Sequence, residues 1–260
     1  MHAQDRLNAA TAATEAGDYA AALENLVWFH EHALTPSPES AGVRRSYALR
    51  AWIALAALYP PAQAALDATR ARAAIALLGG AGNVHTFRDV AAIDRYLQQP
   101  GATYTLYVDL EEGNASLALA CADAALDAII GAGDFVRAAR LAPAPEAAIR
   151  AASERLHDDL DRNKRRRFTG APMRWIYITM YIDAVQQVLA IVRGGGQAAR
   201  LPALGRMAAD LVHNPSVRRA VTAGLVKRPA APVPELKQVR LQVLRARRRQ
   251  TATRRLMKSG

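Results

Sequence analysis

Hydrophobic side chains recur at the spacing of α-helices along most of the chain, and glycine or proline separates one such stretch from the next. Near the N-terminus an alanine-rich stretch runs into Gly17-Asp18-Tyr19, and a second apolar pattern opens at once. Small side chains let two helices approach closely, the Gly-Asp pair makes the turn, and we expect Tyr19 to insert between the helices. The pattern predicts an antiparallel helical hairpin, with helices over about residues 3–16 and 18–34.

Similar patterns predict helices through the rest of the chain, because proline and glycine mark where each helix starts and stops. Thr86 and Asp89 have the spacing of a capping box, which would open a helix at this point. Residues 103–110 have high β propensity, but a lone short strand would have no partner, so we expect a helix there too. The further predicted helices cover about residues 38–58, 61–78, 86–99, 103–110, 114–130, 146–163, 172–193, 199–213 and 216–226.

The composition favours helices that pack closely together. Hydrophobic residues make up 51% of the chain and aromatic residues only 6%, since alanine dominates the apolar set. Alanine is the strongest helix former and fills little volume, so we predict an all-α protein. The composition changes at about residues 164–171. We expect a helical array over residues 1–163, an apolar helical region over 164–228, and a Pro-rich linker with a basic tail over 229–260.

The residues that carry a resemblance to a known family gather in the first of these regions. They are Gly17-Asp18-Tyr19, Ala22, Leu26, Trp52 and the segments 28–34, 42–49, 59–62 and 87–93. This pattern resembles the tetratricopeptide repeat, and over roughly residues 8–163 it is similar to a group of uncharacterised bacterial proteins of that kind. The resemblance implies antiparallel helical hairpins stacked as a right-handed α-α superhelix, with extra C-terminal helices, that binds a protein or peptide; it implies no catalytic activity. A degenerate second copy of the turn is suggested by Gly133-Asp134-Phe135 with Ala138.

We find no pairable nucleophile, acid–base pair or ligand set, and therefore expect a protein that is not an enzyme and needs no cofactor or metal. His30 and His32 point to different sides of a helix, whereas metal-binding histidines on one helix are three or four residues apart. His85 and Asp89 lie across a helix start, which we interpret as a cap. The single cysteine, Cys121, excludes an internal disulfide and fits a reduced, cytoplasmic setting.

One broad face of the third predicted helix is the best candidate for a binding site. Arg44, Tyr47 and Arg50 fall on this face, and Trp28 with His32 on the preceding helix would reach a partner across the same concave surface. A cationic groove lined by aromatic side chains would suit acidic peptides or a C-terminal carboxylate. We therefore hypothesise a non-enzymatic adaptor or scaffold that binds a protein or peptide. In the alternative interpretation Tyr47 and Trp52 belong to the core and the arginines only cover the surface.

Most of the net charge of +11 lies at the C-terminal end of the chain, where nine Lys or Arg and no Asp or Glu occur between Lys237 and Lys258. The densest part of this basic tail consists of Arg245, Arg247, Arg248, Arg249, Arg254 and Arg255. Three interpretations stay open. The tail is a solvated or disordered terminus, or it binds the phosphates of nucleic acid, which would make the chain a nucleic-acid-associated protein. Binding to an anionic membrane surface is the third.

The segment Trp175–Val192 is the most apolar in the chain, and its length is near the lower limit for crossing a bilayer. It contains Asp183, Gln186 and Gln187. A carboxylate in the middle of a membrane-spanning helix costs roughly 3 kcal/mol. We therefore expect a helix that is buried by packing within the protein, and not a membrane span.

Overall fold

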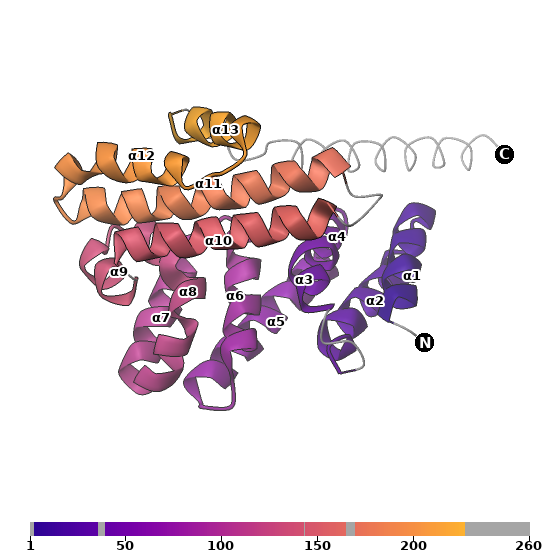
Figure 1. Ribbon diagram of the computed structural model, residues 1–260. Helices are drawn as coiled ribbons and strands as arrows, with labels where there is room; N and C mark the ends of the chain where they lie inside the picture. The colour runs from indigo at the N-terminus through magenta and orange to yellow at the C-terminus, as the bar shows by residue number, and fades with distance from the viewer. Residues whose placement is uncertain (1–2, 36–39, 143, 165–169, 227–260) are drawn as a thin grey trace. The chain divides into compact units, whose positions relative to one another are not determined.

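The computed structural model describes residues 3–35, 40–142, 144–164 and 170–226, and the regular elements of these residues are all helices (Figure 1). The all-α prediction is therefore confirmed. The described residues form two compact units, which divide between Ala118 and Leu119. Each unit has its own buried apolar core.

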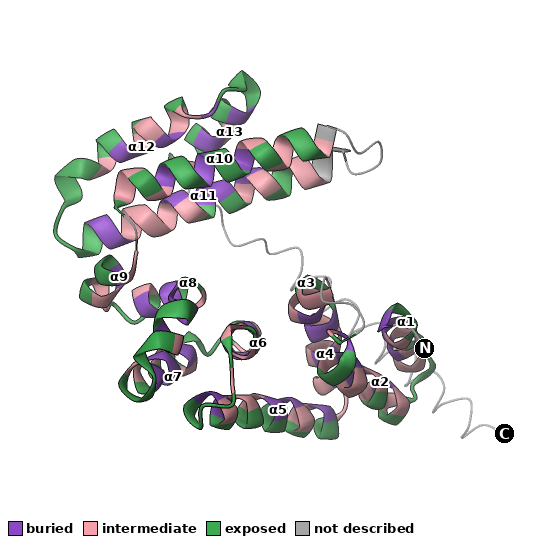
Figure 2. Cartoon of the chain, turned by 60° about the horizontal axis from the view of Figure 1, so that its bottom comes forward, coloured by how far each residue is buried: buried purple, intermediate pink, exposed green. Residues whose placement is uncertain are grey.

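The first unit contains α1 to α7 and the first turn of α8. The bounds are α1 Ala3–Ala16, α2 Tyr19–His32, α3 Ala41–Val43, α4 Leu49–Ala56, α5 Pro60–Leu78, α6 Val84–Tyr96, α7 Pro100–Gly113 and α8 Ala115–Gly131. A π turn at Arg44–Ala48 joins α3 directly to α4, so the third predicted helix is one helical run with a wider turn inside it. In α5 the buried and the exposed residues lie on opposite sides (Figure 2). The β-prone segment 103–110 is helical, as predicted, and lies inside α7.

Helices α1 and α2 form the predicted hairpin. Gly17 has a φ of +83°, in the left-handed region that glycine adopts at little cost, and the chain reverses there. Asp18 accepts a hydrogen bond from the N–H of Ala21 at 3.1 Å and so caps α2. The ring of Tyr19 lies 6.1 Å from the ring of Tyr59, so its observed aromatic neighbour is the residue that precedes α5. The buried side chains of the hairpin include Leu7, Ala10, Ala22 and Leu26.

Helix α6 begins earlier than predicted, and Asn83 is its N-cap. The Oδ1 atom of Asn83 accepts hydrogen bonds from the N–H groups of His85 at 2.9 Å and Thr86 at 3.2 Å. The hydroxyl of Thr86 accepts one in return from the N–H of Asn83 at 3.3 Å, which completes a capping box. The prediction that Thr86 and Asp89 form the cap is wrong, because Thr86 is the third residue of the helix and Asp89 is buried further along it.

The second unit continues α8 and adds five more helices. Their bounds are α9 Phe135–Leu141, α10 Pro145–Lys164, α11 Gly170–Gly194, α12 Leu201–Asp210 and α13 Pro215–Val226, with a 3₁₀ turn at Ala198–Arg200 before α12. Ile149 and Leu156 of α10 share one core with Ile182 and Val185 of α11. The division between the units therefore lies within α8, whereas the change of composition at 164–171 falls between two helices of one core. The expected linker and tail at 229–260 lie outside the described residues.

The Gly-Asp turn occurs a second time, at the start of α9, and it has the same local structure as the first. Gly133 has a φ of +76°. Asp134 accepts a hydrogen bond from the N–H of Arg137 at 3.0 Å, which caps α9. Ala138 is fully buried, as Ala22 is at the equivalent position of the first turn. The Gly-Asp turn therefore recurs with the same local geometry, and a helical repeat beyond the turn stays a prediction.

Helix α11 is long and apolar enough to cross a membrane over Met173–Gly194, by length and composition alone. It is the one described helix that meets this test. Ile178, Tyr181 and Ile182 are buried in the core of the second unit, so this side of the helix packs as predicted. The prediction that α11 is buried is wrong for part of its surface, because several large side chains of α11 are exposed.

We expect Gln98→Gly and Gly17→Ala to change the free energy of unfolding in opposite directions. Gln98 follows α6 with a φ of +59°, the one described non-glycine residue with a positive φ. A side chain in this region costs about 1 kcal/mol, so glycine at position 98 should stabilise the fold by somewhat less than that. Alanine at position 17 should destabilise it by about 1 kcal/mol through backbone strain alone, since a Cβ there meets no atom within 4 Å.

Urea unfolding measures both changes. Gly101→Ala is the matched control, because Gly101 also has open space around its Cα but lies in α7 without a positive φ. Alanine favours the helix, so this control should be neutral or stabilising. Equal effects of Gly17→Ala and Gly101→Ala would contradict the backbone explanation.

Candidate functional site

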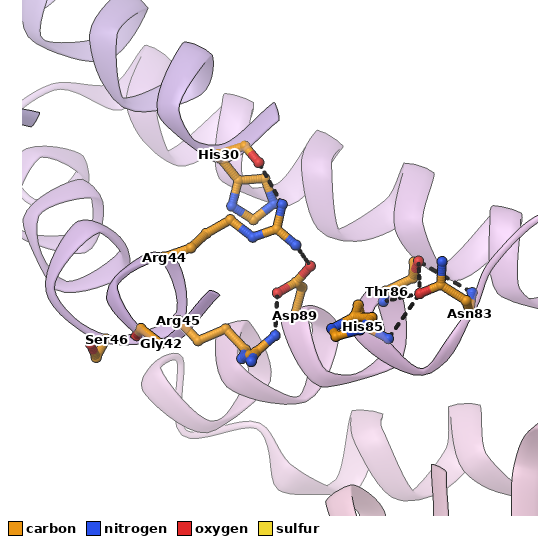
Figure 3. Close-up of polar contacts among 9 residues, drawn as sticks. All are labelled: His30, Gly42, Arg44, Arg45, Ser46, Asn83, His85, Thr86 and Asp89. Carbon is orange, nitrogen blue, oxygen red and sulfur yellow. Dashed lines mark hydrogen bonds and ion pairs between the residues drawn. The ribbon is translucent and has the colours of Figure 1, made fainter. Parts of the chain in front are cut away.

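The side chain of Arg44 lies at the centre of a buried polar cluster in the first unit (Figure 3). Its Nη1 donates to the carbonyl oxygen of His30 at 2.7 Å, and its Nη2 donates to Oδ2 of Asp89. Nη1 of Arg45 lies 3.5 Å from the other carboxylate oxygen of Asp89. These contacts connect the end of α2, the π turn and α6.

The charges of this cluster are held away from water. Burial raises the pKa of Asp89, although the neighbouring Arg44 and Arg45 act in the opposite direction. Burial likewise lowers the pKa of Arg44, against the attraction of Asp89. Burial thus opposes the charge on both groups, and their mutual contact offsets part of that cost. Because the Arg44 guanidinium is occupied inside the protein, the expectation that Arg44 faces a partner across a groove is wrong.

The π turn that follows Arg44 presents Tyr47 to solvent. Arg44 and Ala48 are buried, whereas 49% of Tyr47 is exposed, so the alternative that Tyr47 is a core residue is also wrong. Val43, one turn earlier, is 37% exposed. Arg50 follows in α4 and is half-buried. π turns inside α-helices are rare and are frequent at functional sites, so an exposed aromatic ring on one marks this surface as a candidate site.

Trp28 and His32 form a second group at the end of α2. Their rings lie 5.4 Å apart, and the guanidinium of Arg6 lies over the indole of Trp28 at 4.9 Å. His32 is exposed and Trp28 is half-buried. The sequence analysis missed Arg6, which comes from α1 across the hairpin. Trp28 and His32 thus meet each other, whereas Arg44 belongs to the buried cluster with Asp89.

The side chain of His30 packs against the core of the first unit. Its ring meets the ring of Trp52 edge-on at 5.8 Å, and the indole N–H of Trp52 donates to the carbonyl of Ala62 at 2.9 Å. Burial, with Arg44 and Arg72 nearby, lowers the pKa of His30 to about 4. The imidazole is therefore neutral at neutral pH.

A second buried carboxylate on α6, Asp94, was also missed. Arg70 of α5 donates to its two oxygens, with Nε and Nη2 at 2.9 and 3.0 Å. The hydroxyl of Thr103 in α7 donates to Asp94 at 2.9 Å. A sequence signal for it exists, because Asp94 falls on the same helical face as the buried Val90. An acidic residue within an apolar stripe indicates a buried partner.

No family model, curated protein or solved structure matches the chain. The tetratricopeptide resemblance therefore stays a prediction carried by the residues quoted for it. The six arginines proposed for the basic tail, at positions 245 to 255, lie outside the described residues, so their role also stays a prediction.

We expect Asp89→Ala to lower the free energy of unfolding by about 3–5 kcal/mol, because it leaves the Arg44 charge buried without its carboxylate. Replacing both partners, with Arg44→Met and Asp89→Leu together, should cost much less, since neither charge is then taken out of water. Urea unfolding of the single and double variants gives the comparison. A double variant as unstable as Asp89→Ala would contradict this account.

We also expect acid to weaken the fold through His30. The folded pKa of about 4 lies below the ordinary value of 6.5, so the unfolded chain binds the proton more readily. The contribution of His30 is full above pH 6.5 and is lost as the pH falls toward 4, by about 1.4 kcal/mol per pH unit.

His30→Gln cannot titrate and serves as the reference in this measurement. The advantage of the wild type over this variant, measured by urea unfolding, should shrink steadily across that pH window. Other carboxylates titrate equally in both proteins and cancel in the difference. A difference in stability that is independent of pH would show that the imidazole is not protonated on unfolding.

Proposed function

We propose that the chain is a non-enzymatic adaptor that binds a protein or peptide, and that its first unit carries the binding surface. In this proposal the helical hairpins stack in the tetratricopeptide-like manner that the sequence resembles. The hairpin of α1 and α2, with its Gly-Asp turn and small buried side chains, supports the proposal. The surface centres on Val43, Tyr47 and Arg50, which we call the Tyr47 surface.

The observation that carries the proposal is the exposed Tyr47 ring on a π turn whose first residue, Arg44, is anchored in the interior. Tyrosine is enriched at the energetic centres of protein interfaces, since its ring is apolar and its hydroxyl can exchange hydrogen bonds. A rigid support lowers the entropy that is lost on binding. The buried ion pair of Arg44 and Asp89 provides that support.

The residues of the original groove hypothesis take different roles in this proposal. Tyr47 and Arg50 contact the partner, and Arg50 adds a cationic group suited to acidic side chains. Trp28 and His32 provide a second contact at the end of α2. Arg44 positions the surface without touching the partner.

Tyr47→Ala should reduce recovery of the partner at least tenfold without lowering the stability of the fold, as expected for an exposed interface hot spot. Affinity capture from the native cell, quantified for each recovered protein, measures the loss, and thermal unfolding checks the fold. Leu78→Ala is the matched control, because Leu78 is 50% exposed in the same unit but lies on α5. Equal recovery by Tyr47→Ala and Leu78→Ala would count against the proposal.

Nucleic-acid binding through the basic tail is the second candidate, and the arginine cluster in the sequence favours it. Clustered arginines bind phosphates strongly, with little sequence preference and steep salt dependence. Such binding does not involve the Tyr47 surface. Retention on nucleic acid that is unaffected by Tyr47→Ala would therefore separate the two candidates.

A further inference from the structure

Two imidazole rings stack on each other at the point where α12 and α13 meet α10. The ring of His157, on α10, lies 4.1 Å from the ring of His213, and the two ring planes differ by only 14°. His213 lies between α12 and α13, and we call residues 211–214 the α12–α13 corner. The backbone N–H of His213 also donates to Nε2 of His157, at 3.5 Å. The pair thus joins the corner to α10 through the rings and through the backbone.

This contact requires a neutral imidazole at position 157. Nε2 can accept a hydrogen bond only while it carries no proton, because both ring nitrogens of a protonated imidazole are donors. Protonation would therefore place an N–H of the ring against the N–H of the His213 backbone. A proton on His213 as well would bring two like charges to the stacking distance of 4.1 Å. Acid opposes the contact in both ways.

The surroundings of His157 favour its neutral form on balance. Burial lowers the pKa of His157, and the nearby His213 lowers it further. Asp161 and Asp158, which lie on α10 beside His157, act in the opposite direction. The two carboxylates limit the fall in the pKa of His157 but do not reverse it.

The neighbouring elements bring charges of both signs to the corner. Arg174 of α11 lies 3.4 Å from Oδ1 of Asn214, and Arg218 of α13 contacts the backbone of Val212, so positive charge lies on both sides of His213. The remaining charged side chains within about one turn of the pair along α10, α12 and α13 are Glu154, Asp159, Asp210 and Arg219. Of these, Asp159 pairs with Arg162 at 2.9 Å.

The other described contacts of the corner do not titrate near neutral pH. The hydroxyl of Ser153 donates to the carbonyl of Leu211 at 3.3 Å, and Nε of Arg218 donates to the carbonyl of Val212 at 2.9 Å. The side chain of Val212 is fully buried. Serine and arginine keep their protonation states between about pH 5 and 8, whereas histidine changes its charge there. Among the described contacts of the corner, the histidine pair is therefore the one that responds to acid in this range.

We propose that the His157–His213 pair is an acid-sensitive anchor, which holds the α12–α13 corner against α10 at neutral pH and loosens it when the rings are protonated. The contribution of His157 to stability is full above its ordinary pKa of 6.5 and is lost as the pH falls, because the unfolded chain binds the proton more readily. The contacts of Ser153, Arg218 and Val212 persist, so the corner loosens without unfolding of the unit. This device lies in the second unit and is independent of peptide binding by the first.

A metal ion explains the pair less well. The lone pair of a ring nitrogen lies in the plane of its imidazole, and the planes of two stacked rings do not meet at a single ion. Nε2 of His157 is already directed at a backbone N–H. The described part of the chain also contains no group of three or more His, Cys, Asp or Glu side chains that could hold a metal. The geometry therefore fits a proton better than a metal.

NMR titration of the imidazole resonances in the full chain tests whether the two rings are coupled. His213→Gln should raise the pKa of His157 by about 0.7 pH unit, or about fivefold in proton affinity, which is the repulsion expected between two exposed charges at this distance in water. His85→Gln is the matched control, because His85 is an exposed histidine of the first unit, and it should leave the pKa of His157 unchanged. A pKa of His157 that is the same in the wild type and in His213→Gln would show that the rings do not interact.

Amide hydrogen exchange, corrected for the intrinsic effect of pH, tests whether acid loosens the corner. Protection of residues 211–218 in the wild type should fall about fivefold between about pH 7.5 and 5.5. Amides around Val185, in the core of the unit, should not change. His157→Phe is the sharpest variant, because it retains a flat ring for stacking and cannot be protonated. Both His157→Phe and His157→Gln should have a protection at the corner that is independent of pH.

Three outcomes would overturn the proposal. Protection at the corner that is constant across this pH range in the wild type would show that the pair is not an acid-sensitive anchor. An equal fall in the wild type and in His157→Phe would show that another group responds to acid. A rise in protection when zinc chloride is added at neutral pH, present in the wild type and absent from His157→Gln, would identify the pair as a metal site.

Discussion

The first unit depends on a pair of opposite charges that has been taken out of water. An isolated carboxylate or guanidinium in the interior costs several kcal/mol, on the order of 5, so the fold tolerates Arg44 and Asp89 there only while they meet. Arg44 also donates to the backbone of α2, and its position is therefore set from two sides. The exposed Tyr47 ring follows three residues later in the same helical run. The geometry of this surface is thus set by a buried contact inside the unit.

Helix α6 carries two buried carboxylates that are paired with arginines. Asp89 connects it to the π turn, and Asp94 connects it to α5 through Arg70 and to α7 through Thr103. Apolar contacts alone tolerate small sliding of one helix past another, whereas a buried ion pair is satisfied at one register. In a helical array rich in alanine the short side chains interlock weakly, so such ion pairs help to fix the register of one helix against the next.

The helices and turns of this chain could be predicted because their signals are local. Gly17, Asp18 and the prolines in the first turns of α5 and α7 specify where helices end and begin within a few residues of sequence. The burial of Arg44 could not be predicted in this way, since its partner Asp89 lies 45 residues further along the chain. Helical spacing predicted that Arg44, Tyr47 and Arg50 share one face of a helix; in the structure Tyr47 is exposed, while Arg44 is buried.

The two units differ in where their charged and apolar side chains lie. In the first, charge within the interior sets the geometry and the candidate surface is an aromatic ring beside cations. In the second, the core of α10 to α13 is apolar, and the excess of apolar residues in α11 extends to the outside of the unit. The composition predicted an apolar helix, but it could not show which side would lack cover.

The direction in which Tyr47 points depends on how many residues the π turn contains, and not on which residues they are. A π turn accommodates one residue more than an α-helical turn would, and each residue rotates a helix by about 100°. Deletion of a single codon within Arg44–Ala48 would restore a regular helix and carry every later side chain of α4 around the axis. In the evolution of such a surface, the loss of one residue would therefore redirect the exposed side chains more abruptly than a replacement of the Tyr47 ring itself.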